Sequence, residues 1–377
     1  MPYQALAAIM RSVDDPIAIE EVELADLRDN EVLVRIEACG VCYTDVKFRS
    51  QLPLPAVLGH EGVGVVEDIG GSVNGFTKGD RVIISYPFCT RCIACERSQP
   101  FACESIPRLK FSGGRLDGSK TINLDGKPIT SAFFQQSSFA TRAIALEDAL
   151  VKVDTDLPSE FLAALPCGIQ TGAGSVLNTF EMGAHHSLAV FGVGSVGLGA
   201  IMAAKVVGAG PRIAIDIEPR RLELALSLGA TNAIDGRAPD VVQQVKAIAP
   251  RGVSHVLETT ADTAVLERAI ECLAQGGRAG IVSAPPSGQR NPFTTRGLFE
   301  RVASLHGIVQ GFAVPRLFLP KLIEMQSRGA FPFERLVTPY PFMEINRAMA
   351  DFAAGTIVKP VLVMRDIAAP HAGHSMP

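Results

Sequence analysis

The chain has 377 residues, of which 47% are hydrophobic and 20% charged, a balance that predicts a folded protein with about two domains of ordinary size rather than a disordered one. Its formal net charge of −4 and its lack of a long Lys/Arg run argue against a nucleic-acid or anionic-membrane partner. No apolar run reaches membrane-spanning length, and "MPYQALAAIM" lacks a basic segment followed by a long apolar core. We therefore expect a cytoplasmic protein whose partners are small molecules.

The first part of the chain has the pattern of β-structure with many turns. "IEEVELADLRDNEVLVRIEACGVC" contains short alternating runs broken by Asp, Asn and Gly, and the Val-rich, Gly-punctuated "VLGHEGVGVVEDIG" follows it. These features predict a β-rich domain over residues 1–168.

Three dispersed residues in this part have side chains that bind metals. Cys42 lies in "GVCYTD", His60 precedes Glu61 in "GHEGVG", and Cys167 lies in "LPCGIQTG". Two cysteines and one histidine make the three-ligand set of a catalytic zinc, whose fourth position stays open for chemistry. Spacing alone leaves this open, because a single Cys or His in an apolar context is more often a packed core residue.

The lobe at residues 88–104 concentrates half of the eight cysteines of the chain. "CTRCIACERSQPFAC" supplies four candidate ligands: Cys89, Cys92, Cys95 and Cys103. Four thiolates at this spacing can surround one Zn²⁺ tetrahedrally, at roughly 2.3 Å per bond, and leave no open position. Two disulfides or an iron–sulfur cluster remain alternatives, although a cytosolic setting disfavours the disulfides. We favour a structural zinc.

From residue 169 the pattern changes to alternating strands and helices. Apolar strands such as "SLAVFGVG", "RIAIDI" and "HVLETT" are separated by Ala/Leu-rich helical stretches such as "VGLGAIMAAKVVGA". Strand and helix in alternation predict parallel βαβ units, and hence a doubly wound parallel-sheet domain over residues 169–309.

The first strand of this region runs into a glycine-rich turn that opens a helix. The candidate contacts for a dinucleotide are Gly192, Gly194, Ser195, Val196 and Gly197. In this fingerprint the glycines permit a tight turn and close approach of the pyrophosphate, and the helix N-terminus supplies oriented N–H groups. Asp216 ends the next strand, where a carboxylate would bond the ribose 2′-hydroxyl and repel a 2′-phosphate, which favours NAD over NADP.

The last part of the chain contains a further helix-and-strand region over residues 310–366. It ends in "INRAMADFAAGTIVKPVLVM", whose final strand we expect to return to the first domain. The tail, residues 367–377, is expected to be disordered.

Taken together, these pieces resemble the zinc-dependent medium-chain alcohol dehydrogenases from about residue 5 to residue 364. The motifs that carry the resemblance are "GVCYTD", "GHEGVGVVEDIG", the four-cysteine lobe, "LPCGIQTG" and "VFGVGSVG". The resemblance implies an α/β protein in which a GroES-like β-rich catalytic domain is interrupted by a Rossmann domain. It also implies hydride transfer between an alcohol and NAD, with one catalytic and one structural zinc per subunit.

The resemblance assigns roles to the dispersed residues. Cys42, His60 and Cys167 match the catalytic zinc ligands of the family. Glu61 matches an acid that can approach the metal during ligand exchange. Asp45 matches a carboxylate that accepts the free ring N–H of His60 and fixes its orientation.

Further matches concern the substrate and the cofactor. Thr44 matches the hydroxyl that contacts the substrate oxygen, Lys359 a basic position at the cofactor pyrophosphate, and Arg221 a position near the adenosine ribose. Two positions depart from the liver-type pattern: Tyr43 stands where many members have Arg or His, and Lys47 where a histidine ends the proton relay. The relay is therefore expected to end in water or at Lys47, although an exposed lysine is a poor base at neutral pH.

The C-terminal third looks closest to the aryl-alcohol (benzyl-alcohol) dehydrogenase branch, so an aromatic or allylic primary alcohol is the expected substrate. Phe88, Leu109 and Val282 are candidates for an apolar pocket. A homo-oligomer, either dimer or tetramer, is expected. The alternatives are a glutathione-linked formaldehyde dehydrogenase or polyol dehydrogenase of the same superfamily and, more remotely, a non-catalytic NAD-binding regulatory protein.

Overall fold

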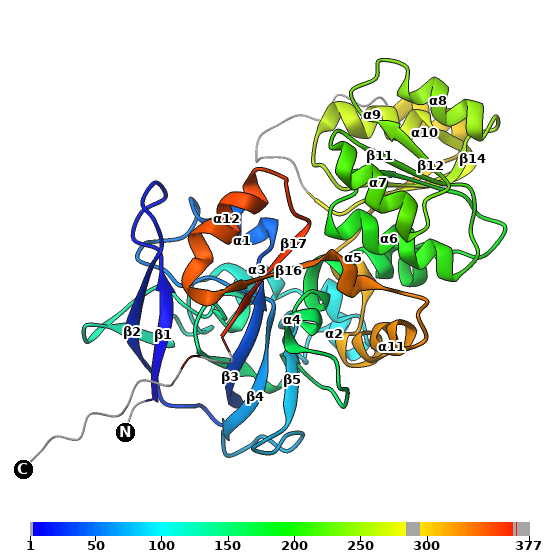
Figure 1. Cartoon of the computed structure of the whole chain (residues 1–377). Coiled ribbons are helices and arrows are strands. Elements are labelled where there is room, and N and C mark those ends of the chain that lie inside the picture. Colours follow the sequence, from blue (N-terminus) through cyan, green and yellow to red (C-terminus); the bar gives the residue numbers. More distant parts are fainter. Residues whose placement is uncertain (1–2, 284–294, 365–366, 368–377) are drawn as a thin grey trace, which may run out of the picture. The chain divides into compact units, whose positions relative to one another are not determined.

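The computed structural model describes residues 3–283, 295–364 and 367, which form two compact units (Figure 1). Unit 1 comprises the described residues of Met1–Cys167, Val314–Pro320 and Glu334–Pro377. Unit 2 comprises those of Gly168–Ala313 and Lys321–Phe333. Residues 310–313 and 321–333, which we expected to return to the catalytic domain, thus belong to unit 2. The expected disordered tail, apart from residue 367, lies outside the described residues.

Unit 1 is built on two β-sheets, as the alternating patterns predict. The larger sheet has the order β16-β17-β3-β4-β5-β9, with β8 paired to β3. Its strands are β3 (Glu31–Gly40), β4 (Gly62–Ile69), β5 (Arg81–Ile84), β8 (Arg142–Leu146), β9 (Leu150–Lys152), β16 (Val337–Pro341) and β17 (Lys359–Val363). The smaller sheet has the order β1-β2-β6-β7, formed by β1 (Tyr3–Ile9), β2 (Ala18–Leu24), β6 (Ile122–Leu124) and β7 (Lys127–Pro128).

Short helices and turns connect these strands. The helices of unit 1 are α1 (Tyr43–Phe48), α2 (Ile93–Glu96), α3 (Ile106–Phe111), α4 (Ser159–Leu162) and α12 (Ile345–Ala353). Short 3₁₀ turns are η1 (Pro100–Ala102), η2 (Phe133–Gln135), η3 (Glu147–Ala149), η7 (Phe333–Leu336), which begins one residue before this unit, and η8 (Phe342–Glu344). The return of the chain to this unit is direct, because β17 pairs antiparallel with β3, matching Leu362 to Cys39.

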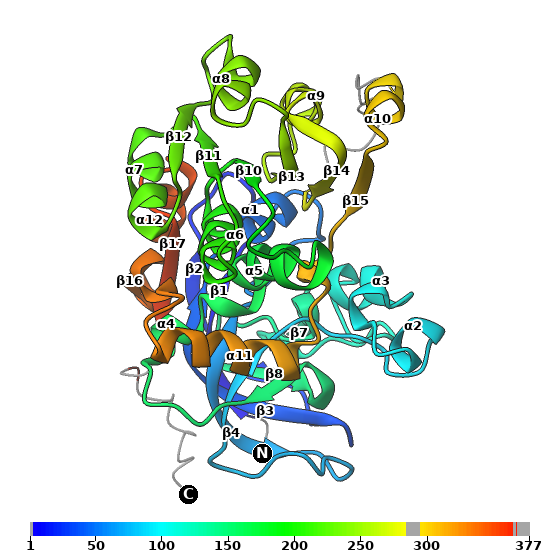
Figure 2. The same cartoon turned by 90° about the vertical axis from the view of Figure 1, so that its right-hand side faces the viewer.

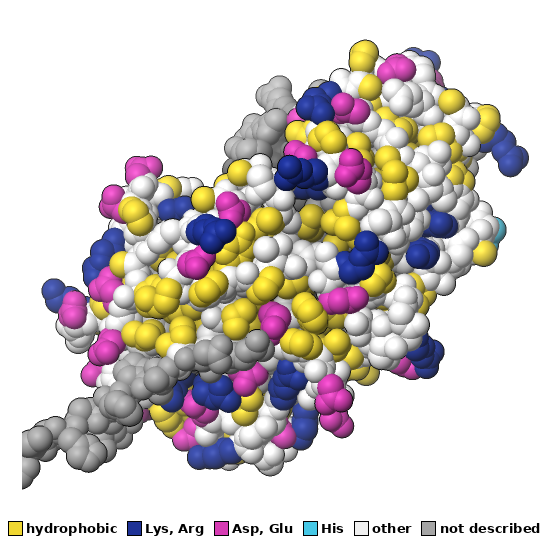
Figure 3. Space-filling model, viewed as in Figure 1, with side chains coloured by type: hydrophobic (Ala, Val, Ile, Leu, Met, Phe, Trp, Pro, Cys, Tyr) yellow, Lys and Arg dark blue, Asp and Glu magenta, His cyan; other side chains and the backbone are white. Residues whose placement is uncertain are grey.

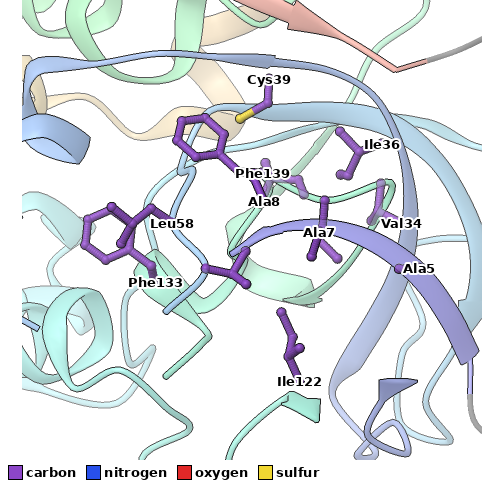
Figure 4. Close-up of a cluster of buried hydrophobic side chains, with 14 of the residues drawn as sticks. Ala5, Ala7, Ala8, Val34, Ile36, Cys39, Leu58, Ile122, Phe133 and Phe139 are labelled. Atoms are coloured by element: carbon purple, nitrogen blue, oxygen red, sulfur yellow. The ribbon is translucent and has the colours of Figure 1, made fainter. Parts of the chain in front are cut away.

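The core of unit 1 lies between its sheets. Figure 4 shows small side chains of β1, including Ala5 and Ala7, packed close to Val34, Ile36 and Phe139. Ala7 also forms an isolated bridge with Ala140, which joins β1 to the larger sheet. Close packing of this apolar surface is the main contribution to folding of this unit.

Unit 2 contains a six-stranded parallel sheet in the order β12-β11-β10-β13-β14-β15 (Figure 2). The strands are β10 (Leu188–Phe191), β11 (Arg212–Asp216), β12 (Asn232–Asp235), β13 (Val253–Glu258), β14 (Leu273–Ile281) and β15 (Ser304–Gly307). In Figure 1 the sheet lies between α8 (Val241–Ile248), α9 (Thr263–Glu271) and α10 (Thr295–Arg301) on one face and α6 (Ser195–Val206) and α7 (Pro219–Leu228) on the other. This is the predicted doubly wound Rossmann arrangement.

The remaining elements of unit 2 precede and follow this sheet. Before it lie α5 (Gln170–Gly174) and η5 (Ser175–Thr179), and after it lie η6 (Gln310–Phe312) and α11 (Pro315–Ser327), whose first turns belong to unit 1. Among the described residues, no helix is long and apolar enough to cross a membrane. On the face shown in Figure 3, basic and acidic side chains are interspersed.

Candidate metal and cofactor sites

The start of α1 positions the first candidate metal ligand. Cys42 is the residue before this short helix, and its extended backbone (φ −125°, ψ 156°) sets the entry into the helix. Its backbone N–H donates a 2.9 Å hydrogen bond to the carboxylate of Asp45, one turn later. The thiol is thereby held at a helix N-terminus, where the backbone dipoles favour a thiolate.

Asp45 also fixes the second candidate ligand. Its carboxylate accepts hydrogen bonds from the backbone N–H of Gly59 (3.2 Å) and, at 3.0 Å, from Nδ1 of His60. Although burial opposes the charged ring, Asp45 and Cys42 raise the pKa of His60 to about 10, so a metal would have to displace the proton from Nε2 to bind there. A carboxylate on one ring nitrogen leaves the other to act as the ligand. The predicted role of Asp45 as the partner of His60 agrees with this geometry.

Cys167 reaches the same place from a distant part of the sequence. It lies in a π-helical turn, Leu165–Ile169. Such turns are rare and occur often at functional sites. Its Sγ is 3.8 Å from that of Cys42, and the hydrogen bond between them lowers the pKa of Cys42. The structure therefore brings together the three residues that the sequence motifs single out.

The geometry of this cluster fits a tetrahedral zinc. The candidate ligand atoms of Cys42, His60, Glu61 and Cys167 all lie within 4.8 Å of one another. Zn–S bonds of about 2.3 Å at a tetrahedral angle place two sulfurs roughly 3.8 Å apart, which is the separation observed. Nε2 of His60 is buried and has no hydrogen-bond partner among the described residues. A buried polar atom without a partner is costly, and a metal would satisfy this one.

Glu61 is held next to the cluster by Lys359 of β17. The Lys359 ammonium donates hydrogen bonds to the Glu61 carboxylate and, at 3.3 Å, to the carbonyl of Val41. Burial raises the pKa of Glu61 to about 7, against the opposing effect of Lys359. Lys359 is only 1% exposed. The expected contact with the cofactor pyrophosphate would thus require the ammonium to leave Glu61, and it stays a prediction.

The four-cysteine lobe forms a second cluster with the geometry of a zinc site. The sulfurs of Cys89, Cys92, Cys95 and Cys103 lie within 4.8 Å of one another. The distances from Cys95 are 4.0 Å to Cys89 and 3.6 Å to Cys92, close to the tetrahedral value and far beyond the roughly 2.05 Å of a disulfide. None of the eight cysteines of the chain forms a disulfide. This geometry favours the zinc interpretation over the disulfide alternative.

The glycine-rich turn of unit 2 has the backbone that its sequence predicts. Gly192 adopts a left-handed φ of 87°, and its N–H donates to the carbonyl of Ile215 at 2.8 Å. A Cβ at Gly197 would clash with the carbonyl oxygen of Gly192, whereas a Cβ at Gly194 would meet nothing within 4 Å. The third glycine is thus required by packing, and the second leaves open space at the start of α6, where Ser195 and Val196 begin the helix.

Asp216 lies at the carboxyl end of β11, next to the same turn. Its carboxylate accepts hydrogen bonds from the N–H groups of Val193 at 2.7 Å and Glu218 at 2.9 Å. These bonds fix the acid at the position where a dinucleotide-binding fold places its ribose contact. Arg221 follows in the first turn of α7.

Comparisons with known proteins give matches along nearly the whole chain. A family model for the alcohol dehydrogenase GroES-like domain matches residues 28–154, and one for zinc-binding dehydrogenases matches residues 195–324. Geraniol dehydrogenase of Castellaniella defragrans is 42% identical over 363 residues, which are 95% of this chain and 97% of the relative. This chain belongs to the zinc-dependent medium-chain alcohol dehydrogenases. The family predicted from the motifs is therefore confirmed.

Two solved structures show the same fold over the length of the dehydrogenase chain. An alcohol dehydrogenase zinc-binding domain protein from Burkholderia ambifaria has a TM-score of 0.94 at 42% identity and covers 98% of this chain and 100% of its own. Benzyl alcohol dehydrogenase from Acinetobacter calcoaceticus has a TM-score of 0.92 at 38% identity and covers 96% of this chain and 99% of its own.

Three further residues of the predicted site lie on α1: Thr44, which matches the family pattern, and Tyr43 and Lys47, which depart from the liver-type pattern. Thr44 is half-buried, and its hydroxyl oxygen is 3.8 Å from Sγ of Cys42. Tyr43 is 64% exposed. Lys47 is half-buried in the next turn.

Of the three predicted pocket residues, two belong to unit 1. Leu109 is buried in α3, and Phe88 packs half-buried against the core of unit 1. Val282 lies in unit 2, after β14, and is half-buried.

Sequence reasoning missed the aromatic side chains that contact His60. The ring of Phe134 stacks on the imidazole at 4.4 Å between centroids, and Phe133 meets it edge-on at 5.7 Å. Both residues belong to η2, where Phe134 has a left-handed φ of 53°. The adjacent aromatic pair in "SAFFQQSS" was the available signal, but a sequence gives no indication that a bulky residue will adopt a left-handed backbone.

Proposed function

We propose that this dehydrogenase oxidises primary alcohols with an allylic or benzylic carbinol carbon to aldehydes, reversibly, with NAD⁺ as hydride acceptor. The observation that carries the proposal is the convergence of Cys42, His60 and Cys167, with their ligand atoms at zinc-binding separations. The geraniol and benzyl alcohol dehydrogenases named above are similar along nearly the whole chain, and their names supply the substrate class. The aromatic side chains on His60 suit an unsaturated substrate.

Cys42, His60 and Cys167 would hold the catalytic zinc, and Cys89, Cys92, Cys95 and Cys103 a structural one. When bound, zinc supplies a Lewis acid that favours the deprotonated alcohol, and NAD supplies the hydride acceptor. We therefore propose two zinc ions per chain.

The protein side chains provide orientation and proton transfer. Asp45 locks the His60 ring through Nδ1, so that Nε2 faces the cluster. The Thr44 hydroxyl, beside Cys42, would accept the alcohol proton and pass it toward solvent, with Lys47 or water as the last acceptor. Glu61, paired with Lys359, places a carboxylate within reach of the other ligands.

The cofactor preference rests on Asp216 and the glycine turn. The open space at Gly194 would admit the pyrophosphate to the backbone, beside the N-terminus of α6. The Asp216 carboxylate would accept a bond from the ribose hydroxyls and repel the 2′-phosphate of NADP. Arg221 is proposed to lie near the adenosine ribose.

The location, oligomeric state and partners of the protein are also part of the proposal. We infer a cytoplasmic homo-oligomer, dimer or tetramer, that acts on small molecules and binds neither nucleic acid nor membrane. A net charge of −4 and the interspersed charges on the face in Figure 3 support the last point.

Two matched substrate pairs test the proposal by NADH formation. Geraniol and benzyl alcohol should be oxidised with higher kcat/KM than citronellol and cyclohexylmethanol, their counterparts without unsaturation at the reacting end, and NADP⁺ should be a poor substitute for NAD⁺. Equal or better oxidation of the saturated alcohols would contradict the substrate class. Preference for S-(hydroxymethyl)glutathione would instead favour the glutathione-linked alternative.

A further inference from the structure

Lys110 of α3 is a buried cation close to the candidate catalytic cluster. The side chain is only 5% exposed, and its ammonium lies 4.9 Å from the ring centroid of Phe134 and 5.2 Å from that of Tyr86. Because the Phe134 centroid is 4.4 Å from that of His60, the ammonium is no more than 9.3 Å from the centre of the imidazole. All of these residues belong to unit 1.

The ammonium has no acceptor in the described part of the chain. No hydrogen bond or ion pair joins the Lys110 side chain to any described residue, and the contacts of its ammonium are the two aromatic faces. Burial lowers the pKa of Lys110 to about 8, although the charge of Cys167 opposes this. Two aromatic faces compensate only part of the cost of burying a cation, and with no protein acceptor the N–H groups of Lys110 are free to donate to a ligand.

The surrounding backbone holds Lys110 and Phe134 in fixed positions. The side-chain amide of Gln135 donates 3.0 Å hydrogen bonds to the carbonyls of Leu109, in α3, and Gly114, in the segment that follows α3, so η2 is tied to the chain before and after Lys110. Phe134 itself has a left-handed φ of 53°, a strained conformation for a bulky side chain. Strain of this kind persists where the surroundings determine it and is concentrated at functional sites.

We propose that Lys110 is a specificity-determining residue whose ammonium donates a hydrogen bond to an oxygen on the substrate ring, remote from the reacting carbinol. This inference rests on the proposed function, because it concerns a substrate bound at the same cluster. Within the proposed substrate class, it predicts a preference for alcohols that carry a second oxygen function, such as a phenolic hydroxyl.

A purely apolar ring is the competing occupant. Such a ring would offer Lys110 a third aromatic face but no acceptor for its N–H groups. An oxygen on the ring would accept a charge-assisted hydrogen bond, which is stronger than a neutral one. The two occupants differ in the substrates that they favour, so kinetics can separate them.

The test compares 3- and 4-hydroxybenzyl alcohol with the methylbenzyl alcohols of the same size, in wild type, Lys110→Met, Lys110→Arg and Lys127→Met. Methionine keeps the length of the stem and removes the charge. Lys127 is an exposed lysine in β7 and serves as the matched control. The measured quantity is the ratio of kcat/KM for each hydroxyl substrate to that for its methyl counterpart.

We expect the ratio for the preferred isomer to fall at least about ten-fold in Lys110→Met, mainly through KM, because one charge-assisted hydrogen bond is lost. Lys110→Arg should recover part of the ratio, and Lys127→Met should leave it unchanged. An unchanged ratio in Lys110→Met, or a fall for hydroxyl and methyl substrates alike, overturns the proposal. If Lys110→Met does not fold, Lys110→Gln is judged by the same ratio.

Failure of the underlying function gives a different result. If wild-type enzyme with zinc and NAD⁺ oxidises neither geraniol, nor benzyl alcohol, nor any substituted benzyl alcohol, the proposed function itself is wrong. If benzyl alcohol is oxidised but the ratios do not depend on Lys110, only the role of Lys110 is wrong.

Discussion

Lys359 and Glu61 form an ion pair inside unit 1, although they are 298 residues apart in the sequence. The pair joins β17 to the residue that follows His60, so the last strand of the chain supports the candidate metal cluster. Removing one member of a buried ion pair leaves an uncompensated charge, whereas removing both charges is far less costly.

We therefore expect Lys359→Met to lower the free energy of unfolding by about 3–5 kcal/mol. The double variant Lys359→Met/Glu61→Gln should be more stable than the sum of the two single effects predicts. Urea denaturation of the four proteins measures this coupling. Additive effects would show that the two side chains are not energetically coupled.

Asp45 should control zinc affinity without touching the metal. Its carboxylate accepts bonds from Cys42, Gly59 and His60, so Asp45→Asn removes the charge that orients the ring. Loss of such a partner weakens metal binding by roughly 10–100-fold. Competition with a chelator measures the affinity, and Asp125→Asn, at an exposed position, is the control. Equal zinc affinity in wild type and Asp45→Asn would show that the Asp45 carboxylate does not support metal binding.

The two glycines of the nucleotide turn should respond differently to alanine. Gly194→Ala adds a Cβ to open space, so the variant should fold normally but bind NAD⁺ at least about ten-fold more weakly, because the methyl group occupies the path of the pyrophosphate. Gly197→Ala should instead lose about 1–3 kcal/mol of stability through its clash with Gly192. Thermal unfolding and NAD⁺ titration separate the two effects. A lower free energy of unfolding in Gly194→Ala would contradict the open space around this residue.

His255 should make unit 2 sensitive to acid. Burial, with smaller effects from His186 and Arg278, lowers the pKa of His255 from its ordinary 6.5 to about 3. At a pH between these two pKa values, the unfolded chain binds a proton at His255 that the folded chain does not bind. The stability that comes from keeping His255 neutral is therefore complete above pH 6.5 and is lost as the pH falls. The slope is at most about 1.4 kcal/mol per pH unit, or about 2 kcal/mol between pH 6.5 and 5.

Urea denaturation of wild type and His255→Asn at pH 7.5 and 5 tests this sign. Asparagine can keep a hydrogen bond with Ser254, whose hydroxyl is 2.9 Å from Nδ1 of His255. The variant should lose less stability on acidification than wild type. Identical losses would assign the acid sensitivity to other groups, such as metal ligands that become protonated.

The sequence predicts most of the fold because its signals are local. Alternating apolar residues indicate the strands of unit 1, and the turn at Gly192, between a strand and a helix, indicates the Rossmann unit. The four-cysteine lobe is also visible, because its ligands are close together in the chain. Cys42, His60 and Cys167 needed the family resemblance, since no local pattern reveals that three distant residues meet.

The features that sequence reasoning missed depend on tertiary packing. The π-helical turn at Cys167 and the left-handed backbone of Phe134 are imposed by surrounding contacts rather than by residue preference. The sequence shows that Lys359 is basic, which suits either a contact with the cofactor pyrophosphate or an ion pair with an acid. Its burial in an ion pair with Glu61 follows only from the pairing of β17 with β3. Lys110 in "RLKFSGG" looks like a surface residue until α3 and η2 are packed together.

Metal content per chain, measured by elemental analysis together with benzyl alcohol oxidation, tests the central claim most directly. Wild type should hold two zinc ions and be active. Cys167→Ser should lose the catalytic zinc, keep the structural zinc, stay folded and be inactive. Cys95→Ser should lose the structural zinc and keep the ligands of the catalytic zinc. Cys272→Ala, a buried cysteine outside both clusters, should hold two. Two zinc ions or full activity in Cys167→Ser would contradict the assignment of the catalytic site.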